Sequence, residues 1–143
     1  TTTDLNSPIA DIKADICELP FASKSFDFIL CNHVLEHIPN DLKAMQELFR
    51  VMKPGGVGIL QIPLDVNRKT TFEDNSITDP KQRAKIFGQY DHVRVYGLDY
   101  FERLESCGFK VEKVDFTKTL SKKEISKYCL SEGELIPVVY KPN

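Results

Sequence analysis

The chain has 143 residues, of which 41% are hydrophobic and 28% charged, and its formal net charge at pH 7 is −2. This length and composition are typical of one globular domain with a sizeable core. The near-neutral charge argues against binding nucleic acid or an anionic membrane through a basic surface, and no apolar run approaches the roughly 20 residues of a membrane-spanning helix.

The four cysteines, at positions 17, 31, 107 and 129, form no C-x-x-C pair. Three of them lie in or beside apolar segments, which favours reduced packing cysteines of a cytoplasmic protein over a disulfide framework. The chain opens with the polar stretch TTTDLNSP, so we expect no signal peptide. No repeat or low-complexity linker divides the chain, and we predict a single domain over residues 1–143.

The first predicted elements are short strands. The β-branched residues before Asp4, followed by the turn sequence NSP, predict the end of a strand. Residues 9–16 alternate loosely and predict a second strand. Residues 25–32, SFDFILCN, form an apolar run bounded by polar residues, which predicts a strand buried on both faces.

A helix with clear boundaries follows. Residues 39–41, Pro-Asn-Asp, supply a cap and an acid at the positive end of a helix. Apolar residues then recur at helical spacing as far as Met52. The KPGG sequence at 53–56 ends the helix, and residues 57–63, VGILQIP, predict another buried strand.

The second half of the chain begins with a polar, irregular segment at 64–97. It contains one short predicted helix, which starts at a Thr78-Asp79-Pro80 cap and ends at Gly88. The remaining pattern predicts four more elements in order: a helix at 98–109, a strand at 109–116, a short helix at 121–133 and a last strand at 134–141. Strands that alternate with helices favour an α/β layer fold with a mostly parallel sheet.

The strand at 25–32 runs directly into His33, Glu36 and His37. These residues match the H-x-x-E-H pattern of the inverted zincins, in which a helix places two histidines on one face for tetrahedral zinc. Pro39 leaves no room for a helix of several turns, and nothing in the sequence marks a third protein ligand. We therefore expect no metal site, and a zinc hydrolase is the last of our hypotheses. The cluster is also compatible with polar residues in an ordinary loop turn.

A nucleotide site is the alternative, because ligands of open α/β sheets bind beyond the carboxyl ends of the strands. The sequence from 15 to 56 resembles the class I S-adenosylmethionine-dependent methyltransferases of the type 11 kind. It has, in order, an acid and an apolar residue before LPF, an FD-x-I strand, H-x-L-E-H, and a helix that ends in R-V-x-K-P-G-G. The resemblance covers residues 1–63 and continues over 100–116. It implies a Rossmann-like sheet with helices on both faces and S-adenosylmethionine as the cofactor.

The resemblance implies six cofactor-binding residues: Asp4 for the ribose hydroxyls, Asp15 and the Ile16 backbone N–H for adenine, Leu19 against the adenine face, and Asn32 and His33 at the methionine end. A carboxylate suits a vicinal diol because it offers two acceptor oxygens. The alternatives are that Asp4 only caps a turn and that Asp15 is a solvated loop acid.

The family's glycine-rich loop between its first strand and first helix has no counterpart here. The only glycine cluster, at 54–58, lies between a helix and a strand, which is the wrong context for a nucleotide loop. If Asp4 ends the family's second strand, the chain begins after the first strand and helix. We then expect an incomplete sheet, weak cofactor binding, and a homodimer or a rearrangement at the open edge near residues 25–32.

Acceptor-side residues are expected in the segment GQYDHVRVYG. His92, Arg94 and Tyr96 alternate and would share one face of an extended segment, with a possible catalytic base, a guanidinium and a phenol. Arg94 would hold a carboxylate or phosphate of the substrate, His92 and Tyr96 are the catalytic candidates, and His37 is placed on the substrate side. The alternative is a polar strand face exposed to water.

Three functions follow from these observations. The first is methyl transfer from S-adenosylmethionine to a small-molecule acceptor. The second is a non-catalytic interaction or dimerisation remnant of the same fold, and the third is the zinc hydrolase. Composition and charge give no reason to expect a nucleic-acid or membrane partner.

Overall fold

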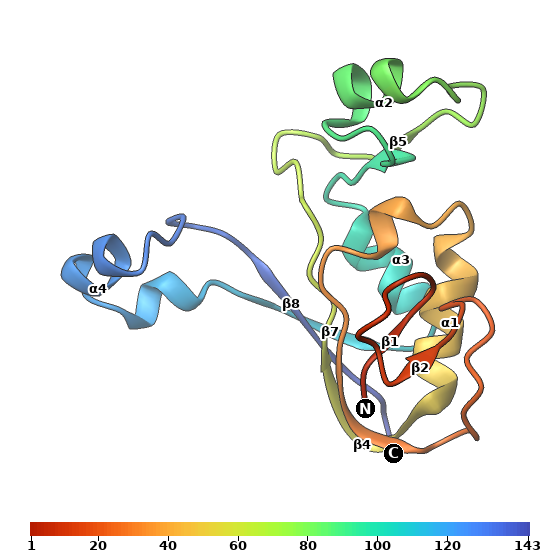
Figure 1. The fold of residues 1–143 in the computed structure, drawn as a ribbon. Coiled ribbons are helices and arrows are strands. Elements are labelled where there is room, and N and C mark those ends of the chain that lie inside the picture. The colour runs from red at the N-terminus through yellow and green to blue at the C-terminus, as the bar shows by residue number, and fades with distance from the viewer.

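The structure, a computed structural model, describes every residue from Thr1 to Asn143. Its main sheet has the strand order β3–β4–β8–β7, and Figure 1 labels the last three of these strands. The strands are β3 Phe26–Leu30, β4 Met52–Ile59, β7 Lys110–Val114 and β8 Ile136–Tyr140. Strands β3 and β4 are parallel, whereas β8 is antiparallel to both β4 and β7. The prediction of a mostly parallel sheet is wrong for this part, because the chain reverses direction between β7 and β8 instead of crossing over.

Two small strand pairs lie outside the main sheet. Strand β1 (Thr3–Asp4) pairs in parallel with β2 (Ile12–Lys13). Strand β5 (Phe72–Glu73) pairs antiparallel with β6 (Arg94–Val95). This pairing joins the early and late parts of the polar segment at 64–97. The strand predicted at 9–16 is thus confirmed only as a two-residue pairing.

The predicted helix boundaries at the middle of the chain are confirmed. Helix α1 spans Asp41–Val51, and the Asn40 side chain accepts a hydrogen bond from the Lys43 N–H. Helix α2 spans Pro80–Phe87, with Asp79 as its cap and Gly88 in the left-handed conformation after it. These boundaries are local, because the capping side chain lies within three residues of the N–H that it binds.

The later helices are short. Helix α3 spans Tyr100–Ser106, and α4 spans Lys122–Lys127 behind a capping box of Ser121 and Glu124. Two 3-10 turns, η1 (Leu35–His37) and η2 (Phe116–Thr119), complete the structure. The H-x-x-E-H residues therefore lie on a single tight turn and not on an α-helix.

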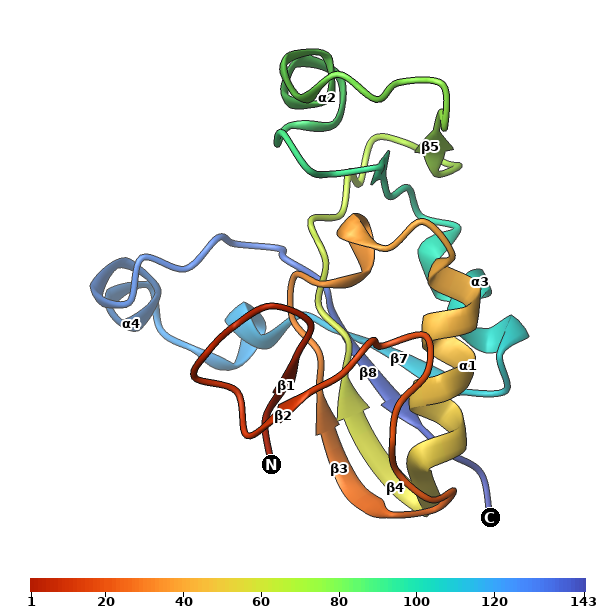
Figure 2. The same cartoon turned by 45° about the vertical axis from the view of Figure 1, so that its right-hand side comes forward.

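Helices α1 and α3 pack on the same face of the main sheet (Figure 2). Their apolar residues join those of β4 and β8 in one core cluster of 15 buried side chains, among them Met45, Leu48 and Leu104. On β3, by contrast, Phe28 and Leu30 are 55% and 60% exposed. Burial of this strand on both faces was predicted and is wrong, because β3 is an edge strand and α4 projects away from the sheet (Figure 1).

None of the helices has the length and hydropathy that a membrane crossing requires. The longest, α1, has 11 residues.

Candidate functional site

The carboxyl ends of β3 and β4 open into a shallow cavity of about 290 Å³, lined by Leu30, Asn32, Ile59, Gln61, Glu134 and Ile136. The Gln61 amide donates to Glu134 Oε1 at 2.8 Å and links β4 to the segment before β8. Asn32 is the only one of the predicted cofactor residues in this lining. The crevice thus lies where an open α/β sheet binds its ligands.

Asp4 lies at the end of β1 and is exposed. Its Oδ1 accepts the backbone N–H groups of Asn6 and Ser7 at 2.7 and 2.6 Å, and these two bonds lower the pKa of Asp4. Its Oδ2 accepts no hydrogen bond from the chain. Asp4 therefore closes a turn and still presents one ionised oxygen to a ligand.

Asp15 is brought next to Asp4 by the pairing of β1 and β2, in which the Ala14 N–H donates to the Asp4 carbonyl oxygen at 3.0 Å. Its Oδ1 accepts the Cys17 N–H at 2.8 Å, and Oδ2 has no partner within the chain. The neighbouring Ile16 N–H donates to no acceptor of the protein. Two adjacent residues, Asp15 and Ile16, thus each keep one polar atom without a partner in the chain.

Leu19 is buried in the core cluster, and its N–H donates to Glu47 Oε2 at 3.0 Å. Glu47 in turn pairs with Arg50, whose guanidinium donates to the carbonyl oxygens of Leu19 and Phe21 at 3.0 and 2.7 Å. These bonds fasten the loop between β2 and β3 to α1. They fix the course of the segment that carries Asp15 and Ile16.

All three histidines of the chain gather around Glu36. His33 follows β3, donates its backbone N–H to the Gln61 carbonyl oxygen at 2.8 Å, and has a φ of +52°, which is uncommon for a residue other than glycine. The His33 Nδ1 lies 3.4 Å from Glu36 Oε1, in a geometry that makes no hydrogen bond. Glu36 is 1% exposed, and neither of its carboxylate oxygens accepts a hydrogen bond.

His37 and His92 meet edge to face, with their ring centroids 4.7 Å apart. The His37 Nδ1 lies 3.2 Å from Asp91 Oδ2, and the His92 Nδ1 lies 3.2 Å from the Phe87 carbonyl oxygen. A carbonyl oxygen can only accept, so the His92 Nδ1 carries the proton of that hydrogen bond and its Nε2 is left as an acceptor or ligand atom. The contact of His37 with Asp91 is an ion-pair contact. One His37 edge is accessible, whereas His92 is buried.

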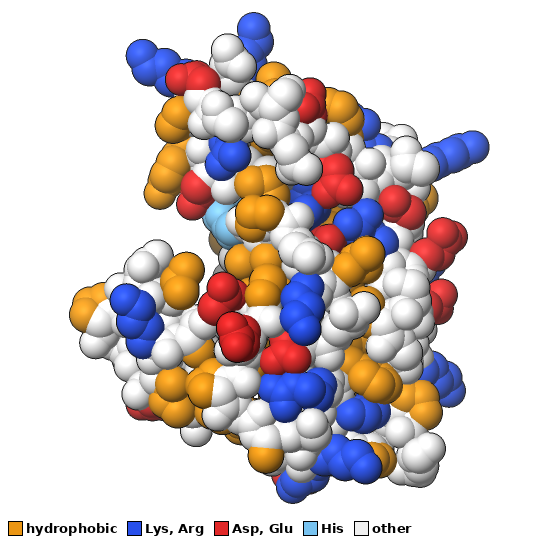
Figure 3. Space-filling model, turned by 90° about the vertical axis from the view of Figure 1, so that its right-hand side faces the viewer, with side chains coloured by type: hydrophobic (Ala, Val, Ile, Leu, Met, Phe, Trp, Pro, Cys, Tyr) orange, Lys and Arg blue, Asp and Glu red, His pale blue; other side chains and the backbone are white.

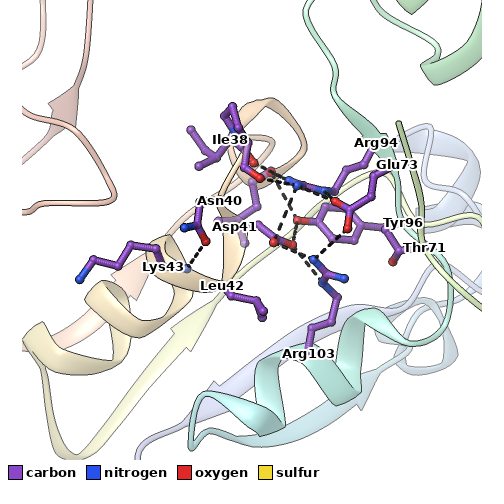
Figure 4. A network of polar contacts seen from close by, with 12 residues as sticks. Ile38, Asn40, Asp41, Leu42, Lys43, Thr71, Glu73, Arg94, Tyr96 and Arg103 are labelled. Carbon is purple, nitrogen blue, oxygen red and sulfur yellow. Dashed lines mark hydrogen bonds and ion pairs between the residues drawn. The ribbon is translucent and has the colours of Figure 1, made fainter. Parts of the chain in front are cut away.

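A buried polar network holds the turn that carries these residues (Figure 4). Arg94, 2% exposed, donates to the carbonyl oxygens of Leu35, Ile38 and Pro39 at 2.9, 2.5 and 2.9 Å, and also to Glu73. Charge-assisted bonds of this kind to carbonyl oxygens fix backbone geometry. Arg94, which belongs to β6, therefore holds the η1 turn and the two residues after it in place.

Asp41 is the centre of the same network. It accepts two bonds from the Arg103 guanidinium at 3.0 and 2.7 Å and one from the Tyr96 hydroxyl at 2.7 Å. Burial and the Asp41 charge raise the pKa of Tyr96 well above its usual range, which keeps the phenol a donor. The network thus ties the start of α1 to β6 and α3.

His92, Arg94 and Tyr96 do not form the exposed polar face that was one of the two expectations. All three side chains are buried, with His92 beside His37, and Arg94 and Tyr96 in the Asp41 network. Sequence patterns gave no sign of Asp91, Glu73 or Arg103 as partners, because each comes from a distant segment and follows no local motif.

The comparisons with known proteins agree with one another in pointing to methyltransferases. The sequence profile of the family described as "Methyltransferase domain" matches residues 2–60. The chain is 30% identical over 118 residues to an uncharacterised protein of Methanocaldococcus jannaschii, covering 81% of this chain and 54% of that one. It is 29% identical over 106 residues to the "Probable S-adenosylmethionine-dependent methyltransferase" of Mycolicibacterium smegmatis, covering 73% and 37% of the two chains.

Among solved structures, the fold is similar to the 1,6-didemethyltoxoflavin-N1-methyltransferase of Burkholderia thailandensis, which was solved with 1,6-didemethyltoxoflavin and S-adenosylhomocysteine bound. The TM-score is 0.60 at 14% identity, and the match covers 99% of this chain and 60% of that one. The chain spans about half the length of the first curated relatives it matches, 54% and 58%.

Proposed function

We propose that the chain is a class I S-adenosylmethionine-dependent methyltransferase, which the family profile over residues 2–60 and the similarity to curated relatives support, and that it takes part in methyl transfer from S-adenosylmethionine to a small-molecule acceptor. The observation that carries the proposal is the pair formed by Asp15 Oδ2 and the Ile16 N–H, both without partners in the chain. Adenine presents an amino donor next to a ring-nitrogen acceptor, so this pair complements its edge.

The remaining cofactor contacts are proposed on the same basis. The free Oδ2 of Asp4 suits a ribose hydroxyl. Asn32 lines the crevice where the methionine end would lie, and His33 is the next residue along the chain. The Leu19 side chain is buried in the core. We therefore propose that Leu19 supports the cofactor site mainly by anchoring the loop that carries Asp15 and Ile16, and less by direct contact of its side chain with adenine. These residues fit the adenosine half of the cofactor; the chain holds no glycine-rich loop for the other half.

The sulfonium of S-adenosylmethionine supplies an activated methyl group. What the protein must add is position: the acceptor heteroatom has to approach the methyl carbon in line with the departing sulfur. We propose that His37 and His92 lie on the acceptor side, where the fold brings their rings together. Arg94 and Tyr96 act as positioning residues, since every polar atom they offer is already bound within the protein.

Amide NMR tests the cofactor site directly. Titration of the ¹⁵N-labelled chain with S-adenosylhomocysteine should shift the Ile16 amide signal and those of its neighbours, even if the dissociation constant is millimolar. The Asp15→Asn and Asp4→Asn variants should each weaken binding at least about tenfold, because a charge-assisted hydrogen bond is worth roughly 1.5–3 kcal/mol.

Asp27→Asn is the matched control for this titration, because Asp27 is an exposed carboxylate whose side chain pairs only with Lys53. It should bind as the unaltered chain does. Shifts confined to residues far from 15 and 16, or equal affinity in the Asp15 variant, would remove the adenine site from the proposal.

The alternative function is that of an interaction or dimerisation remnant, and one observation favours it. Strand β3 has an open edge and exposes Phe28 and Leu30, and free strand edges promote pairing with another chain. We propose a second copy of this chain as the partner. Absence of any amide shift at saturating S-adenosylhomocysteine would favour this function over methyl transfer.

We also propose a cytoplasmic location. All four cysteines are free, and Cys31 is buried, which raises the pKa of its thiol to about 12 through desolvation and the nearby Glu36 charge. Unpaired thiols of this kind are typical of a reducing compartment.

A further inference from the structure

We propose that Glu36, His37 and His92 form a binding site for a divalent transition-metal ion of the zinc class. Each of the three residues offers one ligand atom, and these atoms lie within 4.8 Å of one another. The residues come from two segments, the η1 turn and the chain before β6, which the fold brings together. His33, one of the two histidines that the H-x-x-E-H pattern assigns to zinc, is not part of this set, whereas His92, from outside the pattern, is.

The surroundings of the Glu36 carboxylate indicate that it binds a ligand. Its side chain is almost fully buried, and both carboxylate oxygens are without a hydrogen-bond donor. Buried carboxylates in proteins are paired, hydrogen-bonded or bound to metals, since an unpartnered one costs several kcal/mol. Asp41, a buried carboxylate in the same part of the fold, receives three donors, so the lack of partners is particular to Glu36.

The two histidines are oriented as metal ligands are. Metal-binding histidines almost always donate their other ring N–H to a carboxylate or a backbone carbonyl. Here the His37 Nδ1 meets the Asp91 carboxylate, and the His92 Nδ1 meets the Phe87 carbonyl, both at 3.2 Å. Asp91 is itself held by the Gln89 amide at 3.0 Å. The Nε2 lone pairs are thereby left for an ion.

The η1 turn, which carries Glu36 and His37, is not an α-helix, but hydrogen bonds from other segments hold it rigidly. The Val93 N–H donates to the Glu36 carbonyl oxygen at 2.9 Å, and Arg94 holds the carbonyl oxygens of Leu35 and Ile38. These hydrogen bonds join the η1 turn to residues 93 and 94, next to the residues whose side chains would bind the ion. Ligand atoms around tetrahedral zinc lie about 3.3 Å apart, given bonds of about 2.0–2.1 Å, so side-chain rotation of modest size closes the site.

The donor set selects the kind of ion. Imidazole ligands suit zinc and its neighbours in the first transition row, whereas magnesium and calcium prefer sites made of oxygen atoms. Two histidines and one glutamate are also the protein ligands of open zinc sites, which keep a position for water or substrate. One side of His37 is accessible, and histidine atoms are visible in the wall of the notch below the α2 end of the molecule (Figure 3). An ion could therefore enter from this side.

Metal binding to the chain itself is the test, and it needs no methyl-transfer activity. The protein is prepared without a histidine tag, stripped with chelator, and titrated with Zn²⁺ by competition calorimetry and with Co²⁺ by visible absorption. We expect one ion per chain, Co²⁺ bands typical of a site with nitrogen and oxygen ligands, and no binding of Mg²⁺ at the same concentrations. Zn²⁺ should also raise the thermal midpoint of unfolding.

The variants identify the ligands. His37→Gln, His92→Gln and Glu36→Gln should each lower Zn²⁺ affinity at least tenfold, and Asp91→Asn should lower it about tenfold by releasing the His37 ring. Glu36→Gln should remain folded in the metal-free state, because it removes a buried charge that lacks donors, and circular dichroism checks this. Asp27→Asn, which alters an exposed carboxylate that pairs only with Lys53, is the control and should keep the site.

Either of two results would overturn the proposal. Less than one ion bound at micromolar Zn²⁺, or undiminished affinity in the folded His92→Gln variant, shows that no three-residue site exists. Either result leaves the adenosine contacts of Asp15 and Ile16 untouched, because these are measured by a different titration.

Discussion

Two carboxylates on one short segment have opposite surroundings. Asp41 accepts bonds from Arg103 and Tyr96, whereas Glu36 accepts none. A buried carboxylate stabilises the fold only while its donors remain, because its desolvation is otherwise uncompensated. At the scale of single residues, Asp41 is therefore structural, and Glu36 is left available for a ligand.

Asp41→Ala should lower the free energy of unfolding by about 3–5 kcal/mol, the usual cost of removing one partner of a buried ion pair. The substitution leaves the Arg103 guanidinium and the Tyr96 hydroxyl without their acceptor. Urea denaturation monitored by fluorescence or circular dichroism measures the loss. Asp27→Ala, in which only an exposed pair with Lys53 is lost, should change the stability by less than about 1 kcal/mol. Equal effects of the two substitutions would contradict the structural role.

Glu47 predicts how stability depends on pH. The hydrogen bonds from Arg50 lower the pKa of Glu47 in the folded state, with a further contribution from the Leu19 N–H. Its folded pKa is thus below the unfolded value of about 4.3, so the stabilisation is present above that pH and is lost as pH falls through the folded pKa. Denaturation midpoints measured from pH 6 to pH 3 should fall less steeply for Glu47→Gln than for the unaltered chain. Parallel curves would show that Glu47 contributes no such term.

At the scale of elements, Gly88 and Gly108 end neighbouring helices with the same backbone conformation. Both have positive φ angles, 93° and 102°, at the residue or two after the helix. A Cβ on Gly88 would meet nothing within 4 Å, whereas on Gly108 it would lie 2.9 Å from the Phe49 ring. Alanine substitutions at these two glycines therefore separate the energetic cost of backbone strain from that of a steric clash.

Gly88→Ala should cost about 1–2 kcal/mol, the strain of a left-handed residue with a side chain. Gly108→Ala should cost the same strain and a further 1–3 kcal/mol or so, because the Phe49 ring packs edge to face on Phe109 and cannot move freely. Thermal or urea unfolding of both variants gives the difference. If Gly88→Ala were the more destabilising of the two, the predicted contact of Phe49 with residue 108 would be wrong.

At the scale of the whole molecule, one core extends through the chain. Its buried residues run from Leu19 to Val139 and include members of α1, α3, β4 and β8, which supports our proposal that residues 1–143 form a single domain. The sheet of this domain ends at β3, whose outer edge pairs with no other strand.

Because of that open edge, we predict that the chain self-associates through β3. Light scattering at increasing concentration should show a dimer, and the Phe28→Lys, Leu30→Lys double variant should be monomeric, since charged side chains on an edge strand oppose pairing. Ile9→Lys is the control, because Ile9 is 90% exposed and belongs to the β1–β2 connection and not to β3. A strict monomer at all concentrations would refute the prediction.

The sequence allowed the helices to be predicted with good boundaries, because their signals are local. The Asn40, Asp79 and Ser121 caps each bind an N–H three residues further on, and glycines follow two of the helices. The direction of the last strands and the exposure of β3 were predicted wrongly. Both depend on which strands become neighbours, and a run such as FDFIL reads the same at the centre of a sheet as at its edge.

The chain's own residues thus indicate its resemblance to the methyltransferases and the order of its helices and strands, and they underlie the proposal that Asp4 and Asp15 bind an adenosine. These features are encoded over a few positions, by side chains that act on adjacent backbone. Only the folded chain decides that His92 reaches His37, that Arg94 clamps the η1 turn, and that Glu36 is buried without a donor. Those contacts join segments more than 50 residues apart, and the free energy that selects them comes from packing of the whole core, which no local pattern records.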